Sequence, residues 1–233
     1  MAAVLFLFTQ PVVAQIFTEN KPTDYRQSSF ANPHYNKMAR AALREKPARF
    51  DFMQFRVTYA QTSQYDPIGK DALRELNSLA YTALHESDPE RAQGALFAYQ
   101  AMVSTHLANI DVVMQALSLA RQDKRFGKPA FFEWMRDGLI KTVMISGDGY
   151  TLQGAYDIVT LNEETILLSR LGLKPLESRA VKEGFVYYTM HDVLDVNTDE
   201  RRTVFVNTTI PMKYLEALTE EQKKDLKFDL RRK

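Results

Sequence analysis

Two glycines flank an aspartate in the run Ser146-Gly147-Asp148-Gly149, the most distinctive local pattern that could carry chemistry. Glycine adopts positive φ angles without steric cost, and an aspartate carboxylate accepts hydrogen bonds from the N–H groups that follow it. The run therefore predicts a tight turn. The functional interpretation is that Ser146, Asp148 and Gly149 offer a backbone nest or a carboxylate to a ligand or cation. We favour the turn, because the spacings of a phosphate-binding loop and of an EF-hand are both absent.

Two adjacent glutamates, Glu163 and Glu164, follow Asn162 at the start of a predicted helix. Neighbours on a helix diverge by about 100°, so the two carboxylates cannot face one acceptor. In the first turn, each complements the helix dipole. A carboxylate- or metal-dependent hydrolase that uses Asp148 with Glu163 or Glu164, and His191 as a further group, is the alternative that we keep open.

The four histidines give no recognised catalytic or metal-binding spacing: they are His34, His85, His106 and His191. No two of them lie four residues apart, and no His-Glu-x-x-His occurs, so a helix-borne zinc site is not expected. His191 precedes Asp192 on a predicted strand, where neighbours point to opposite faces, and no Gly-x-Ser-x-Gly elbow is present. We predict structural histidines, no catalytic residue, no metal site and no cofactor.

The amino-acid composition excludes several kinds of binding site and gives no sign of an unusual class of protein. The 233 residues are 45% hydrophobic and 25% charged, near the average for a globular chain. Thirty basic against 29 acidic residues leave a net charge of +1, which gives no electrostatic reason to bind nucleic acid. The absence of cysteine excludes disulfides, thiolate metal sites and thiol nucleophiles.

The N-terminal run 2–14, AAVLFLFTQPVVA, carries no charge. It is too short to span a bilayer, which takes about 20 residues, so we predict no integral membrane segment. The run is typical of the apolar part of a secretory signal, with cleavage between Ala14 and Gln15 and a secreted or periplasmic product. No Lys or Arg precedes it, so a start site assigned too far downstream and an ordinary buried element remain the alternatives.

The rest of the chain divides by its periodicity. Residues 15–65 are polar and rich in proline, and we expect an extended docking segment in which 37–45 form a short helix. Residues 66–146 carry apolar stripes at spacings of three and four, which predict helical hairpins. Stripes that begin at Leu73 and Leu107 lie 34 residues apart, the period of tetratricopeptide repeats; any pair of helical hairpins is the equal alternative.

After residue 146 the pattern favours strands. We expect strands over 155–161, 173–181, 185–196 and 204–210, a helix over 162–171, a short helix over 212–218, and a charged tail over 219–233. The small α+β part thus covers 147–218, and its sheet is mostly antiparallel. The predicted fold class is α+β, with N-terminal helical hairpins followed by this sheet.

Six short runs beyond residue 137 follow one another in a recognisable order, and an aromatic group precedes them. They are Gly138-Leu139-Ile140, Ile145–Gly149, Ala155–Val159, Asn162–Thr165 with Leu167-Leu168, Tyr188 with His191–Val196, and Val204–Asn207, preceded by Phe50-Asp51-Phe52, Phe55-Arg56 and Tyr59. From roughly Phe50 to Pro211 the chain resembles the bacterial domain-of-unknown-function family 4919. The resemblance implies a bacterial, often exported protein, sometimes described as helical-repeat-like, with no assigned activity. Thr165 departs from that family, where an aromatic residue is commoner.

These observations predict a non-catalytic, exported interaction module that binds a peptide or protein partner in the bacterial envelope. The reasoning is that paired helices or a sheet face can hold a peptide. A hydrolase would need Asp148, Glu163 or Glu164 and His191 to converge on one pocket.

Overall fold

The structure is a computed structural model that describes residues 33–218, and of Glu45 the backbone alone. Two sequence-based predictions, the signal peptide over 1–14 and the charged tail over 219–233, lie outside the described residues. Within the described residues, no helix is both long and apolar enough to cross a lipid bilayer.

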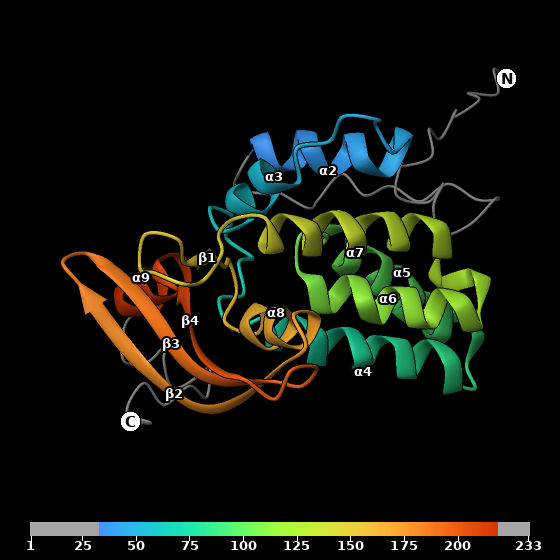
Figure 1. The fold of residues 1–233 in the computed structure, drawn as a ribbon. Coiled ribbons are helices and arrows are strands. Elements are labelled where there is room, and N and C mark those ends of the chain that lie inside the picture. Colours follow the sequence, from blue (N-terminus) through green and yellow to red (C-terminus); the bar gives the residue numbers. More distant parts are fainter. Residues whose placement is uncertain (1–32, 219–233) are drawn as a thin grey trace, which may run out of the picture. The chain divides into compact units, whose positions relative to one another are not determined.

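The described residues form two compact units (Figure 1). Unit 1 contains residues 33–64 and 72–136, and unit 2 contains residues 65–71 and 137–218. Helix α7 (Pro129–Met144) supplies residues to both units, because the division falls after Arg136.

Unit 1 is helical. Its other elements are α2 (Pro33–Glu45), α3 (Phe52–Tyr59), α4 (Asp71–His85), α5 (Pro89–Thr105), α6 (Ile110–Gln122) and the 3-10 turn η1 (Lys124–Phe126). Helix ends follow from local side chains: Asp88 caps α5 through the N–H groups of Glu90 and Arg91, and Pro89 occupies the first turn, where no N–H is needed.

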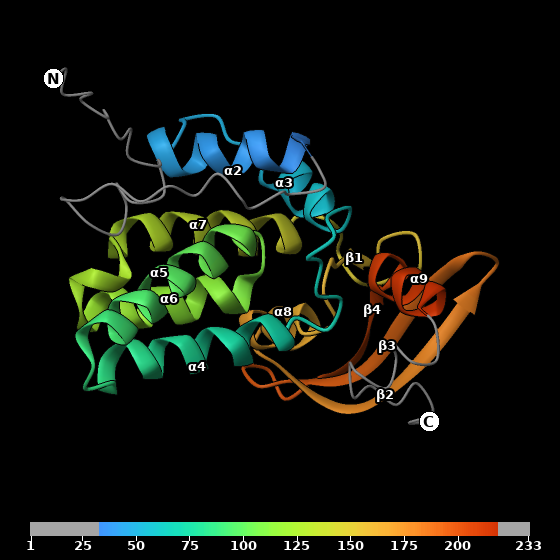
Figure 2. The ribbon, with the colours of Figure 1, turned by 180° about the vertical axis from the view of Figure 1, so that it is seen from behind.

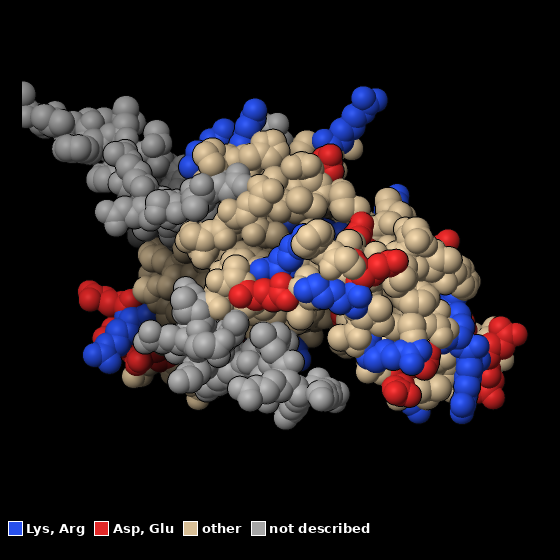
Figure 3. All heavy atoms as spheres, turned by 90° about the vertical axis from the view of Figure 1, so that its left-hand side faces the viewer, with Lys and Arg blue, Asp and Glu red and all other residues tan. Residues whose placement is uncertain are grey.

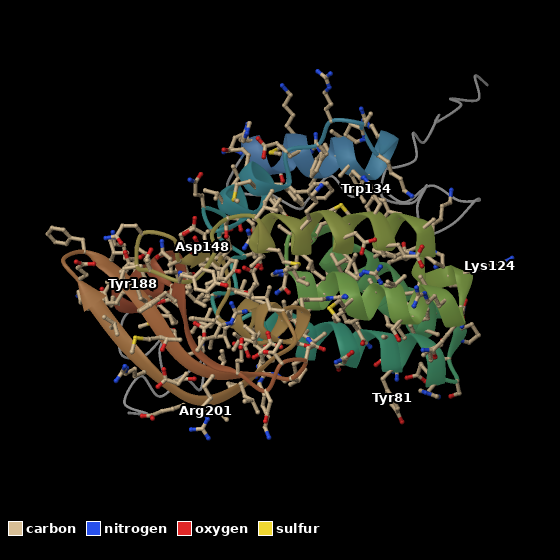
Figure 4. The ribbon with its side chains drawn as sticks, viewed as in Figure 1. Tyr81, Lys124, Trp134, Asp148, Tyr188 and Arg201 are labelled. Carbon is tan, nitrogen blue, oxygen red and sulfur yellow. The ribbon has the colours of Figure 1, made fainter. Side chains whose placement is uncertain are left out.

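The sequence predicts that residues 15–65 are extended apart from a short helix over 37–45; in the described part that helix is α2, which begins earlier, at Pro33, and α3 is an additional helix. Aromatic side chains explain this difference, because each helix has a face to bury. Tyr35 of α2 stacks on Phe55 of α3 with ring centroids 4.9 Å apart, and both side chains are fully buried. Phe52 meets Trp134 of α7 edge to face, with ring centroids 5.1 Å apart; Trp134 is labelled in Figure 4. These aromatic contacts pack α2 against α3, and α3 against α7.

Unit 2 is built on a four-stranded sheet, in the order β1-β4-β3-β2. Its elements are β1 (Tyr156–Asp157), α8 (Glu163–Arg170), β2 (Leu173–Glu183), β3 (Val186–Asp195), β4 (Arg201–Asn207) and α9 (Thr209–Ala217). The β2–β3 and β3–β4 pairs are antiparallel, and β1 pairs with β4 in parallel. Figure 2 shows the same ribbon from behind.

The two faces of this sheet differ in what covers them. Tyr187, Thr189 and His191 alternate along β3 and so share one face. Thr189 and His191 contact Glu164 of α8, and the Tyr187 hydroxyl donates to Glu216 of α9, so both helices lie against that face. The opposite face of β3, with Tyr188 and Met190, is half-buried.

The α+β class and the mostly antiparallel sheet predicted from the sequence are confirmed. Two local differences remain. The strand expected over 155–161 is reduced to β1, because the residues after it turn toward α8. The strand expected over 204–210 ends at Asn207, and the next residues begin α9, which tolerates Pro211 since the first turn of a helix leaves its N–H groups without intrahelical partners.

Candidate functional site

The Ser146–Gly149 run forms the predicted turn, and its polar atoms bond to backbone. The Asp148 carboxylate accepts the Tyr150 N–H at 2.9 Å, and the Ser146 hydroxyl accepts the Asp157 N–H at 2.8 Å. The Gly149 carbonyl accepts the Phe205 N–H at 2.9 Å, which ties the turn to β4. The carboxylate, the hydroxyl and the glycine carbonyl thus hold backbone in place.

Gly149 is required in this turn for two reasons. Its φ is +74°, and a Cβ added there would lie 2.6 Å from the Tyr156 ring. Burial raises the pKa of Tyr156, as expected for a phenol packed against the turn. Asp148 itself is exposed and is labelled in Figure 4.

Glu163 is a buried structural carboxylate. Its side chain is 1% exposed, and Oε2 accepts the Val159 N–H at 2.8 Å. The side chain of Asn162, the expected cap of α8, makes no capping hydrogen bond, so the acidic first turn of α8 is tied to the preceding loop by Glu163 instead. Burial, and secondarily the nearby Glu163 charge, raises the pKa of Tyr65.

Glu164 points in a different direction and lines a pocket in unit 2. The pocket has a volume of about 480 Å³. We call it the α8 pocket. Its helical wall consists of Glu164, Thr165, Leu168 and Ser169, and the β2–β3 hairpin adds Pro175, Ser178 and His191. The helical residues recur at the spacing of one helix face, which is why they converge on one cavity.

Three of these side chains form a chain of polar contacts. The Ser178 hydroxyl lies 2.7 Å from His191 Nδ1, and His191 Nε2 lies 3.1 Å from Glu164 Oε2. The second contact is close but not aligned as a hydrogen bond. Thr189 donates its hydroxyl proton to Glu164 Oε1 at 2.7 Å, which fixes the carboxylate.

The imidazole is more buried than its two partners. His191 is 4% exposed, the Glu164 side chain is 16% exposed, and Ser178 is exposed. If the ring carries its proton on Nε2, facing the carboxylate, the Nδ1 lone pair accepts the Ser178 hydroxyl proton. The carboxylate favours this tautomer because it offers acceptors only.

A β-bulge decides which residue of β2 faces His191. Pro175 pairs with Val193 and Glu177 pairs with Asp192, so Leu176 is the additional residue on β2. Beyond the bulge, Ser178 stands directly opposite His191. Uninterrupted pairing from Pro175 would have placed Glu177 there, because each step along one strand matches one step along the other.

The α8 pocket has an acidic lining. Among the described residues that line it, Glu164 is the one carboxylate and no Lys or Arg is present. Elsewhere acidic and basic side chains are interspersed, as on the face drawn in Figure 3. The pocket therefore favours neutral or cationic groups over anions.

The candidate residues named from the sequence separate into two groups. Four of them stabilise the turn or the loop before α8, and none of these four lines the α8 pocket: Ser146, Asp148, Gly149 and Glu163. Glu164 and His191 meet in the pocket, and Ser178 joins them. Asp192 points to the other face of β3, where it accepts the Thr203 hydroxyl proton at 2.8 Å.

The residues 33–218 hold no cluster of three or more His, Asp or Glu side chains placed to bind a metal.

Sequence reasoning missed Ser178. The signals that exist are the strand pattern and Pro175, since proline within a sheet occurs at edge strands and bulges, but they do not fix which residue is left out of the pairing with β3. His106 behaves as predicted for a structural histidine, because it is buried and its Nδ1 lies 2.7 Å from the Tyr59 hydroxyl.

Comparison with protein-family models, with characterised proteins and with solved structures finds no match for this chain. The resemblance to family 4919 therefore stays a prediction.

Proposed function

We propose that the protein is an interaction module that binds a peptide or protein partner, and that the α8 pocket receives part of that partner. The observation that carries the proposal is the pocket itself, in which apolar walls surround a few convergent polar groups: Glu164, Ser178 and His191. Binding sites in proteins commonly have this composition.

The neighbouring edge strand supports a peptide as the occupant. Strand β2 is the last strand of the sheet, runs for 11 residues, and is exposed over most of its length. An edge strand offers backbone N–H and C=O groups to an added strand, and side-chain pockets beside it then give specificity. Its charged residues and its bulge limit indiscriminate pairing, so the pocket supplies the selectivity.

Export to the bacterial envelope, the tetratricopeptide-like character of the helical hairpins and the relation to family 4919 belong to the same proposal. The apolar run 2–14 supports export, and the 34-residue spacing of Leu73 and Leu107 supports the repeat. N-terminal sequencing of the native protein after cell fractionation tests export, because a mature chain that begins at Gln15 is the expected product.

A hydrolase remains the second candidate function, on a different residue set from the one the sequence indicated. Asp148 and Glu163 lie outside the pocket, whereas the contacts of Ser178, His191 and Glu164 favour it.

Peptide binding is tested with a displayed library of random peptides selected on the full chain, followed by affinity measurement on single peptides. Ser169 is exposed on the pocket wall, so Ser169→Trp fills the pocket without disturbing the core. We expect it to weaken the selected peptides at least about tenfold, the equivalent of about 1.4 kcal/mol. Ser118→Trp, at an exposed position on α6, is the matched control and leaves affinity unchanged. Equal affinities in both variants, or a selection that yields no peptide, contradict the proposal.

A further inference from the structure

We propose that Ser178 is a nucleophile activated by His191 and that the α8 pocket transfers acyl groups from esters of neutral or cationic charge. This inference deepens the second candidate function, on which it rests, and it uses the same pocket as the proposed peptide binding. It is carried by the relative positions of three side chains from α8, β2 and β3.

The first step is the pairing of nucleophile and base. Ser178 Oγ lies 2.7 Å from His191 Nδ1, within the range in which an imidazole takes a proton from a hydroxyl. The hydroxyl is on an exposed residue, while the imidazole is buried. A substrate can therefore approach the oxygen while the base stays shielded from water.

The second step is the orientation of the base. Glu164 Oε2 lies 3.1 Å from His191 Nε2, and Glu164 Oε1 accepts the Thr189 hydroxyl proton at 2.7 Å. Glu164 is a positioning residue, because it acts on Ser178 only through His191. The Ser-His-acid arrangement is recognised by geometry and roles, and here the two ring nitrogens exchange the roles they have in the serine proteases. Contacts of this kind are often poorly aligned before substrate binds.

The chemistry balances with water as the co-reactant. Ser178 Oγ forms a bond to the acyl carbon while His191 Nδ1 takes the hydroxyl proton. The bond from the acyl carbon to the leaving oxygen breaks, and that oxygen takes the proton from Nδ1. Water then gives a proton to Nδ1 and its oxygen attacks the acyl carbon, and Ser178 Oγ leaves with the proton. Ester and water become acid and alcohol.

The pocket restricts the class of substrate. Glu164 disfavours an anionic group near the reacting carbon, because the described residues that line the pocket include no Lys or Arg to offset its charge. Thr165 and Ser169 line the same cavity, and their hydroxyl groups are the side-chain donors that the proposal assigns to the oxyanion of the tetrahedral intermediate.

The absence of cysteine from the whole chain permits a direct test of activation. Ser178→Cys introduces one thiol beside His191, Ser169→Cys introduces one in the same pocket, and Ser118→Cys introduces one on α6. A histidine beside a thiol lowers its pKa from about 8.5, so we expect the Ser178→Cys thiol to react with iodoacetamide about tenfold faster at pH 7 than either control. Equal rates in the three variants overturn the proposal.

Two further substitutions in the Ser178→Cys chain separate base from positioning residue. His191→Gln should reduce the alkylation rate to that of Ser169→Cys. Glu164→Gln should move the midpoint of the rate-against-pH profile upward, because the carboxylate stabilises the imidazolium that pairs with the thiolate. A midpoint that Glu164→Gln leaves in place overturns the role of Glu164, and thermal melts verify that each variant is folded.

The acyl-transfer step is tested on the unsubstituted chain with a fluorophosphonate reagent, which loses fluoride to an activated serine. Peptide mass mapping should place one adduct on Ser178, and Ser178→Ala should remove it while the thermal melt stays that of the unsubstituted protein. No adduct on Ser178, or labelling spread equally over several serines, overturns the activity. Loss of peptide affinity in Ser169→Trp is independent of this result, so the failure of either proposal is distinguishable.

Discussion

The Asp148 turn and the α8 pocket lie in the same unit, and both gather polar side chains near the sheet, but those side chains have different partners. In the turn, carboxylate and hydroxyl oxygens accept backbone N–H groups. In the pocket, Ser178, His191 and Glu164 contact one another beside a cavity. A side chain bonded to backbone stabilises the chain path, whereas one bonded to another side chain at a cavity can change its protonation when a ligand arrives.

The comparison also explains why the more conspicuous sequence pattern does not line the pocket. Glycines beside an aspartate are noticeable because the backbone there needs them. Ser178 has no such neighbours, and its place opposite His191 comes from strand pairing.

The largest loss of stability is expected for a substitution at Gly149. Gly149→Ala forces a side chain into positive φ and against the Tyr156 ring, at 2.6 Å. Backbone strain and overpacking of this kind together cost about 3 kcal/mol in the free energy of unfolding. Chemical denaturation measures the loss.

Gly184 provides the matched control for this prediction. Its φ is +59°, but nothing lies within 4 Å of an added Cβ. Gly184→Ala should cost about 1 kcal/mol, from the backbone term alone. Equal losses at Gly149 and Gly184 would show that the turn does not pack as described.

Glu163 and Glu164 allow the turn and the pocket to be compared within one helix, because Glu163 bonds to backbone and Glu164 lines the pocket. Glu163→Ala removes a buried carboxylate that accepts the Val159 N–H, so the free energy of unfolding should fall by about 2 kcal/mol. The alkylation rate of the Ser178→Cys thiol should not change. Glu164→Ala should show the reverse pattern, with a smaller loss of stability and a slower thiol. The same pattern in both variants would contradict the division into structural and pocket residues.

Asp148→Ala should cost about 1 kcal/mol of unfolding free energy, because it removes the acceptor of the Tyr150 N–H. Peptide affinity and thiol reactivity at Ser178→Cys should be unaffected. Asp148→Asn keeps an acceptor oxygen and should recover most of the loss in a thermal melt. A melting temperature of Asp148→Ala equal to that of the unsubstituted protein would count against the structural role.

Most of the fold was predictable because it depends on local pattern. The inward stripe Phe132, Met135, Leu139 and Val143 is buried as its spacing predicts. Helix α8 and the strands β2 and β3 begin and end within a few residues of the expected positions. These features follow from periodicity, caps and turn residues, all of which are read within a short window of sequence.

The pocket was not predictable in the same way. Glu164 and His191 were recognised as ionisable residues, but their contact joins a helix to a strand across the fold. The position of Ser178 depends on the bulge that leaves Leu176 unpaired. Long-range pairing of this kind is fixed by packing of the whole unit, and a single sequence does not record it.

The smallest effect on the free energy of unfolding is expected at Asp123 in unit 1, whose carboxylate, like that of Asp148, accepts a backbone N–H group. Its hydrogen bond to the Arg125 guanidinium holds its pKa below the usual value. A lowered folded-state pKa stabilises the protein above the unfolded-state pKa of about 3.9, and that contribution is lost as pH falls through the folded-state value.

Asp123→Asn should therefore cost less than about 1 kcal/mol at pH 7, since the ion pair is partly exposed, and the difference from the unsubstituted protein should vanish in acid. Urea denaturation at pH 7 and at a series of pH values below the unfolded-state pKa measures how the difference falls. A difference that persists unchanged in acid would contradict the ion-pair explanation.

The most direct test of the central claim is the tautomer of His191, measured by long-range proton–nitrogen NMR on uniformly labelled protein at pH 8. His191→Gln identifies the resonances of this ring among the four histidines. The account predicts a proton on Nε2, facing Glu164, and an unprotonated Nδ1 that accepts from Ser178. A proton on Nδ1 would make Ser178 the acceptor and would contradict the assignment of His191 as its base.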